Sequence, residues 1–160
     1  MMITIKTLID ISSNINYDKP VKIKLENFYG KDRAFVAMWW KITPKEYHHL
    51  SYCAINKRMW KIYKYNPEYM LNVLAHEIGH HYQPFGLCAS ENEYFAQTWA
   101  IKRFIELKEW EAALYSLHSF KRWRDYDWNS RCRIYRMAIE KALKNGQWHK
   151  LLNKVAKNIR

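Results

Sequence analysis

The chain has 160 residues, a formal net charge of +12 and a hydrophobic content of 49%. This length fits one domain with a hydrophobic core, and the small number of glycines and prolines, four of each, argues against a disordered chain. The three cysteines, Cys53, Cys88 and Cys132, form no C-x-x-C pair, which excludes a zinc ribbon and argues against a disulfide framework.

The sequence also lacks the segments that direct a protein to a membrane or to secretion. No run approaches the roughly 18 apolar residues that a membrane span requires. The amino terminus has neither the apolar core nor the cleavage site of a signal peptide. We therefore expect a cytoplasmic protein without a membrane partner.

The first half of the chain is patterned as a small sheet. Residues 3–16 are weakly patterned and fit either a short helix or an irregular lead-in. Apolar and basic residues alternate over 21–25, which predicts a half-buried strand, and an apolar run predicts a second strand over 33–42. A third strand is predicted at about 50–56, and residues 58–65 connect it to the next element.

The second half is patterned as helices. The first of them begins at Pro67, with Asn66 as its cap, and Pro84 ends it. The small sheet followed by helices predicts an α+β fold, with a three-stranded or slightly larger, mainly antiparallel sheet packed on the helices. The remaining elements are predicted as a helix over about 91–107, its continuation or a separate helix over 108–118, a turn at 126–129, a basic helix over 131–144 that Asn145-Gly146 ends, and a last short helix over 147–158.

The positive charge is concentrated at the end of the chain. Residues 121–160 hold twelve Lys or Arg against three acids, a net charge of +9, whereas residues 1–120 have a net charge of only +3. We therefore divide the chain into a domain over 1–120 and a basic helical extension over 121–160 that packs on the same domain.

The segment His76-Glu77-Ile78-Gly79-His80 is an H-E-x-x-H pattern on the helix that begins at Pro67. At about 100° per residue, the two histidines lie roughly 40° apart on one face, where two neutral imidazoles can bind one zinc ion. Glu77 lies beside them, where it can take a proton from a metal-bound water. The apolar residues of this helix, Met70, Leu71, Leu74 and Ile78, lie on the opposite face.

A third ligand is expected, because catalytic zinc sites usually have three protein ligands and one open position. His81 lies on the apolar side of its helix and Glu91 on the far side of the next one. Glu93 shares a face with Ala96 and Ala100, and small residues allow that helix to approach the first one closely. Glu93 is therefore preferred over the other nearby candidates, Cys88 and His118.

A second interpretation of Glu93 remains open. Ser90-Glu91-Asn92-Glu93 has the pattern of a capping box, with Ser90 as the cap and Glu93 at the third helical position. A capping glutamate would produce the same pattern without any metal.

The two motifs together resemble those of a known family. His76-Glu77-Ile78-Gly79-His80, followed by the pattern E-x-x-A-Q-x-W-A from Glu93 to Ala100, is similar to the gluzincin zinc peptidases, especially the minigluzincins and the ImmA/IrrE-type proteins. The resemblance covers about residues 50–105. It implies that His76, His80 and Glu93 bind Zn²⁺ and that Glu77 is the catalytic acid/base. Phe95 and Gln97 depart from the family pattern, in which a second Glu and an Asn or Asp occupy these positions, but Gln97 can still orient a ligand histidine.

The function expected from these residues is hydrolysis of peptide bonds. Zinc lowers the pKa of its water to about 7, and Glu77 passes the proton of that water to the leaving amine. A peptide or protein substrate is expected to pair along the strand at 51–56, taken as the edge of the sheet. Tyr82, Tyr94 and His118 are all possible oxyanion donors, and whether residues 1–20 cover the cleft as a pro-segment stays open.

Two non-catalytic interpretations compete with a peptidase. In one, the basic C-terminal region binds nucleic acid or a protein and the metal site is structural; aromatic residues interleave with Arg and Lys there, and Arg131, Arg133 and Arg136 are the candidate contacts. In the other, the metal serves the fold alone. The alternative to nucleic-acid binding is that the basic residues form a solvated face of packed helices with their aromatic residues in the core. Peptidase activity and nucleic-acid binding are also compatible with each other.

Overall fold

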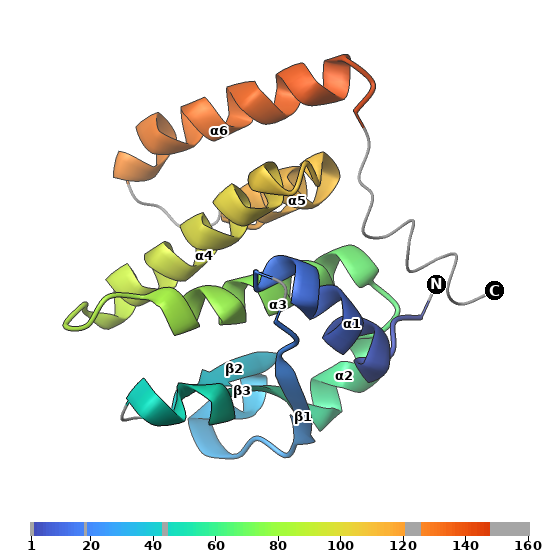
Figure 1. Cartoon of the computed structure of the whole chain (residues 1–160), viewed down its shortest axis with the longest axis vertical. Helices are drawn as coiled ribbons and strands as arrows, with labels where there is room; N and C mark the ends of the chain where they lie inside the picture. Colours follow the sequence, from blue (N-terminus) through green and yellow to red (C-terminus); the bar gives the residue numbers. More distant parts are fainter. Residues whose placement is uncertain (1, 18, 43–44, 121–125, 148–160) are drawn as a thin grey trace.

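A three-stranded sheet lies beneath a layered set of helices, which confirms the α+β class (Figure 1). The computed structural model describes residues 2–17, 19–42, 45–120 and 126–147. None of the described helices is both long and apolar enough to cross a membrane. The elements are α1 (Ile5–Ile15), β1 (Lys22–Glu26), η1 (Gly30–Ala34), β2 (Ala37–Trp40), η2 (Lys45–Leu50), β3 (Tyr52–Asn56), α2 (Lys57–Tyr63), α3 (Pro67–Tyr82), α4 (Ala89–Glu106), α5 (Trp110–Phe120) and α6 (Tyr126–Lys144).

The strand order of the sheet is β1-β3-β2, so β3 is the central strand. The prediction that residues 51–56 form the sheet edge is therefore wrong, and β2 forms the edge beside α3. Cys53, Ala54 and Ile55 are at most 1% exposed, so the short apolar run of β3 reflects burial by neighbours on both sides. β2 pairs with β3 in antiparallel orientation, but β1 pairs in parallel. The sheet is thus mixed rather than mainly antiparallel, because the connection from β1 to β3 contains β2 and is long enough for a crossover.

The weakly patterned residues 3–16 contain a helix, α1, that belongs to the core. Ile3, Leu8 and Ile15 are fully buried, and α1 packs against α3 and β1. The guanidinium of Arg103 on α4 donates hydrogen bonds to the backbone carbonyls of Ile15 and Asn14, both at 2.8 Å, and so satisfies the C-terminal end of α1.

The helix α3 begins as the sequence predicts. The side chain of Asn66 accepts a hydrogen bond from the backbone N–H of Tyr69 at 3.2 Å, and Pro67 is the first helical residue. The predicted connection over 58–65 contains the short helix α2. The predicted apolar face of α3 is confirmed, because its four residues are at most 2% exposed: Met70, Leu71, Leu74 and Ile78.

Two helices follow α4 in the described part of the chain. Lys108, at φ 57°, breaks the helical path, so α5 is a separate helix rather than a continuation. The turn predicted at 126–129 is wrong: α6 begins at Tyr126, since Asp and Asn suit the first turn of a helix as well as a turn. Gly146, at φ 71°, follows the end of α6 as predicted. The predicted helix over 147–158 lies almost entirely outside the described residues.

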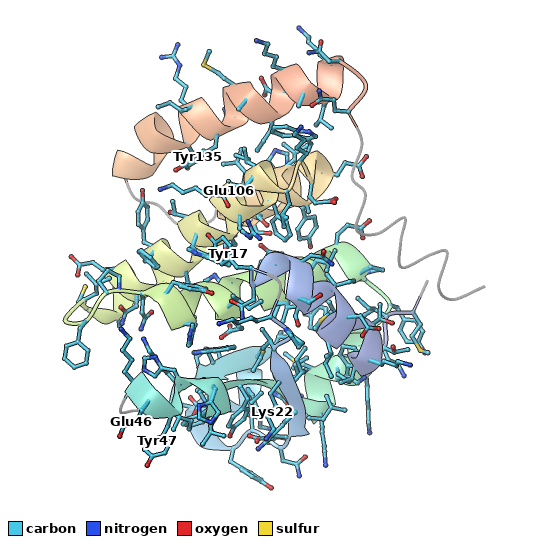
Figure 2. All side chains as sticks on the ribbon, viewed as in Figure 1. Tyr17, Lys22, Glu46, Tyr47, Glu106 and Tyr135 are labelled. Atoms are coloured by element: carbon cyan, nitrogen blue, oxygen red, sulfur yellow. The ribbon has the colours of Figure 1, made fainter. Side chains whose placement is uncertain are left out.

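The basic helix α6 packs on the same helical layer as the rest of the chain. Cys132, Ile139 and Ala142 turn inward and are at most 5% exposed. Tyr135 lies on the side of α6 near α4 (Figure 2), where it borders a small cavity together with Tyr94. The division of the chain at residue 120 stays a prediction.

Candidate metal centre

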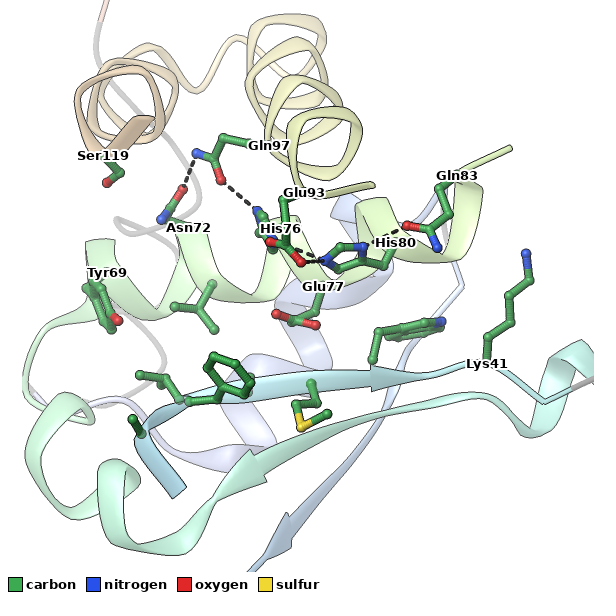
Figure 3. Close-up of a pocket in the computed structure, with 17 residues that line it drawn as sticks. Lys41, Tyr69, Asn72, His76, Glu77, His80, Gln83, Glu93, Gln97 and Ser119 are labelled. Carbon is green, nitrogen blue, oxygen red and sulfur yellow. Dashed lines mark hydrogen bonds and ion pairs between the residues drawn. The ribbon is translucent and has the colours of Figure 1, made fainter. Parts of the chain in front are cut away.

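The helices α3 and α4 approach each other closely at Gly79. A Cβ atom added there would lie 2.6 Å from the backbone oxygen of Ala96 and 2.9 Å from its Cα. Ala96 and Ala100 are fully buried in this interface, as the pattern of small residues predicts. The close approach places Glu93, about one turn before Ala96, directly over the histidine face of α3 (Figure 3).

The structure brings His76, His80 and Glu93 together. Nε2 of His76 lies 2.9 Å from Oε2 of Glu93, and Nε2 of His80 lies 3.3 Å from Oε1. The two Nε2 atoms are 3.1 Å apart. One ligand atom from each residue fits within 4.8 Å of the others, so this group could hold a metal ion. The histidine side chains are only 16% and 14% exposed, whereas that of Glu93 is 40% exposed.

Capping of α4 does not involve Glu93. The helix begins two residues earlier than the capping-box interpretation requires, with Cys88 rather than Ser90 as its cap. Glu91 occupies the third helical position, and its Oε2 accepts a hydrogen bond from the backbone N–H of Cys88 at 3.0 Å. The capping interpretation of Glu93 is therefore wrong, and the carboxylate of Glu93 is left to face the histidines.

A glutamine side chain lies behind each histidine. Oε1 of Gln97 is 2.7 Å from Nδ1 of His76, which fits the expectation that Gln97 orients a ligand histidine. Oε1 of Gln83 is 2.8 Å from Nδ1 of His80. Sequence reasoning missed Gln83; its position three residues after His80 and just before Pro84, at the end of the helix, is the signal that could have found it.

Glu77 lies at the base of the site and is 8% exposed. Burial raises its pKa to about 7, although His76 and His80 oppose this effect and the backbone N–H of Trp39 donates a hydrogen bond to the carboxylate. A carboxylate with a pKa near neutrality can both accept and release a proton at the operating pH.

The three clustered side chains, His76, His80 and Glu93, shift the pKa values of their neighbours in the cluster. Burial would raise the pKa of Glu93, but hydrogen bonds from His76 and His80 outweigh it and hold the pKa well below its usual value. Burial would lower the pKa of His80, yet its contacts with Glu93 and Glu77 raise it. The cluster therefore favours an ionised Glu93 together with a positive charge beside it.

A pocket of about 740 Å³ opens between β2 and α3 and contains this cluster (Figure 3). None of the described residues of 2–17 lines it, so α1 does not cover it. Three aromatic residues, Phe35, Trp39 and Tyr69, are among those that line it. The lining residues are Ala34, Phe35, Val36, Ala37, Met38, Trp39, Lys41, Tyr69, Asn72, Val73, His76, Glu77, His80, Gln83, Glu93, Gln97 and Ser119.

The three candidate oxyanion donors do not belong to this lining. The hydroxyl of Tyr82 donates to the side chain of Asn16, and its ring stacks on Trp99. Tyr94 borders the small cavity beside α6, and His118 is exposed on α5. The lining residues with donor groups outside the cluster and its glutamines are Lys41, Tyr69, Asn72 and Ser119, besides the indole of Trp39.

The other metal-ligand candidates stay apart from the cluster. Cys88 is exposed at the start of α4, and the ring of His81 lies between Trp39 and His48. Of the candidate nucleic-acid contacts, Arg133 is exposed and Arg136 is half-buried on α6, while the side chain of Arg131 lies outside the described part of the structure. Figure 1 places α6 on the far side of α4 and α5 from the sheet.

No family model matches the chain, and neither the curated proteins nor the solved structures gave a match.

Proposed function

We propose that the chain is a zinc-dependent peptidase that hydrolyses peptide bonds in the pocket between β2 and α3. His76, His80 and Glu93 hold the zinc ion, and Glu77 is the general base and acid.

The observation that carries this proposal is the convergence of acceptor atoms at one point. If the amide oxygens of Gln97 and Gln83 accept hydrogen bonds from the Nδ1–H groups of the two histidines, both Nε2 atoms present lone pairs to each other at 3.1 Å. The carboxylate oxygens of Glu93 point at the same place. Such an arrangement is repulsive unless a proton or a metal ion lies between the atoms, and three ligand atoms gathered around one point suit a metal ion.

The donor set favours zinc among the common cations. Two imidazoles and one carboxylate form a set that zinc takes in catalytic sites, where a fourth position stays open. The neighbouring pocket provides the space that an open position needs. A bound zinc ion would lower the pKa of a coordinated water to about 7 and polarise the carbonyl of a substrate.

Glu77 supplies the proton transfer. Its carboxylate lies beside both histidines at the base of the pocket, held by the backbone N–H of Trp39. It takes a proton from the attacking water and delivers it to the amine that leaves the cleaved bond.

The edge strand β2 offers the substrate a backbone to pair with. The carbonyl of Val36 accepts a hydrogen bond from the backbone N–H of Asn56, and the N–H of Ile42 donates to the hydroxyl of Ser51. The even-numbered residues of this segment therefore turn their backbone N–H and C=O groups toward β3. Ala37 and Trp39 then turn their backbone groups outward. Because Glu77 uses the N–H of Trp39, the backbone of Ala37 is the pairing site for an extended peptide.

Peptide cleavage by the zinc-loaded full chain tests the proposal. We expect the wild type to hydrolyse casein or a mixed peptide library, and Glu77→Gln to bind zinc equally well but lose at least 100-fold in rate, the lower range for a general acid–base group. If both proteins bind zinc and are equally inert, the chain is not a peptidase.

A non-catalytic binding module is the second candidate, because the exposed side of α6 carries Arg133, Lys141 and Lys144. In that case the metal would be structural: its removal would unfold the chain, and the chain would bind nucleic acid or an acidic protein in a salt-dependent way.

A further inference from the structure

The side chain of Gln97 uses all of its hydrogen-bonding groups on three partners. It lies on α4, is 5% exposed, and contacts two other helices (Figure 3). Its Oε1 is 2.7 Å from Nδ1 of His76 on α3. Its Nε2 donates to Oδ1 of Asn72 on α3 at 3.1 Å and to the backbone carbonyl of Ser116 on α5 at 2.8 Å.

The carbonyl of Ser116 decides the orientation of this amide. A backbone carbonyl can only accept, so the nitrogen of Gln97 must face it and the oxygen must face His76. The ring of His76 can meet that oxygen only with an N–H group at Nδ1. In the neutral ring the lone pair is then on Nε2, the atom directed at Glu93 and His80. In the charged ring Nε2 donates a proton to the carboxylate of Glu93, and a metal ion would replace that proton. The orientation of a glutamine amide is often ambiguous, but here only one orientation satisfies the neighbours.

Asn72 accepts the second N–H group of the same amide. It precedes His76 by one helical turn on the same face of α3, and it is 9% exposed. A buried asparagine within a helix is unfavourable unless its polar atoms have partners. Here its partner is the side chain that orients a histidine of the metal centre.

The second histidine has a looser support. Nδ1 of His80 lies 2.8 Å from Oε1 of Gln83, which follows α3 and is only partly buried. Within the described part of the chain, the amide nitrogen of Gln83 has no counterpart of the contacts with Asn72 and Ser116 that hold the amide nitrogen of Gln97. The amide of Gln83 is therefore less constrained than that of Gln97, and it fixes the tautomer of His80 less firmly.

We propose that Asn72 is a positioning residue of the metal centre: it acts through Gln97 to hold His76 in the tautomer whose Nε2 lone pair faces the metal. His76 is then the preorganised ligand and His80 the adaptable one. This inference rests on the proposed metal binding, but the tautomer itself is a property of the metal-free chain.

The tautomers can be read directly by NMR of the metal-free full chain. With nitrogen-labelled histidine at alkaline pH, long-range proton–nitrogen spectra distinguish the two neutral forms, and His76→Phe assigns the signals. We expect a single Nδ1–H form for His76 in the wild type. Asn72→Leu should give a mixture at His76 and weaken zinc binding about tenfold, as loss of a partner of a ligand histidine does. Asn72→Asp should restore the single form, since a carboxylate oxygen also accepts from Gln97.

The control variant is Gln83→Ala, which should change the tautomers of His80 and leave His76 unaltered. A folded Asn72→Leu chain that keeps both the single His76 form and the wild-type zinc affinity would overturn the inference. If Asn72→Leu does not fold, the wild-type spectrum decides, because a mixture at His76 contradicts the inference by itself. Zinc binding without peptide cleavage would contradict the peptidase alone.

Discussion

The polar side chains of the metal centre are mostly buried and paired, whereas those on the outer side of α6 are exposed to solvent. At the metal centre, His76, His80 and Gln97 are at most 16% exposed, and each has defined partners. On α6, Arg133 is exposed beside Ile134 and Met137, which are 71% and 61% exposed. Burying a polar group is unfavourable unless it is paired, so a buried arrangement reports a specific chemistry. An exposed charge is under no such constraint and reports little beyond the net charge.

The largest effect is expected from the carboxylate that completes the buried cluster. Glu93→Gln keeps the shape of the side chain but removes its charge, so we expect zinc affinity to fall by more than the roughly 100-fold that supporting residues are worth. Glu91→Gln is the matched control, because Glu91 lies two residues earlier on α4 and caps the helix instead. Competition with a chromophoric chelator measures both affinities. Equal zinc affinity for Glu93→Gln and the wild type would remove Glu93 from the ligand set.

Local periodicity explains why these three side chains could be predicted from the sequence. The faces of α3 and α4 follow from about 100° per residue, so His76, His80 and Glu93 could be found and His81 and Glu91 set aside. The central position of β3 could not be found, because strand order depends on contacts distant in sequence. A short apolar run such as residues 52–56 also fits either an edge or the centre.

The partners of the site were harder to predict for the same reason. The contact of Gln97 with His76 was expected, but the carbonyl of Ser116 reaches it only because α5 packs on α4. The start of α4 at Ala89 also depended on which of two similar capping patterns, at Cys88 or at Ser90, the helix used.

The next effect concerns the close approach that supports the cluster. Gly79→Ala should lower the free energy of unfolding by about 1–3 kcal/mol, the usual range for overpacking, because the new methyl group meets the backbone of Ala96 at 2.6 Å. A loss remains because the neighbouring atoms belong to the backbone of Ala96 and cannot rotate away. The better helix propensity of alanine offsets about 1 kcal/mol of it. Zinc affinity should fall as well, because a displaced α4 carries Glu93 with it.

Chemical denaturation of the metal-free chain measures the stability of this variant. Lys102→Ala, at an exposed position of α4, should stay within about 0.5 kcal/mol of the wild type and serves as the control. A Gly79→Ala chain as stable as the wild type, with the same zinc affinity, would mean that α4 can shift without cost.

The smallest effect on the fold is expected at the outer side of α6. The double variant Arg133→Ser and Lys141→Ser should change stability by no more than about 0.5 kcal/mol and leave zinc affinity unaltered, because both side chains are exposed and far from the pocket. If α6 contacts phosphates, the plot of log binding constant against log salt concentration should become shallower by about 0.7 for each charge removed, the value for a single strand. Fluorescence anisotropy of a labelled single-stranded oligonucleotide over a salt series measures that slope. An unchanged slope would identify this side of α6 as a solvated face. The slope depends on the number of Lys and Arg side chains that neutralise a phosphate, whether or not their contacts have a fixed geometry.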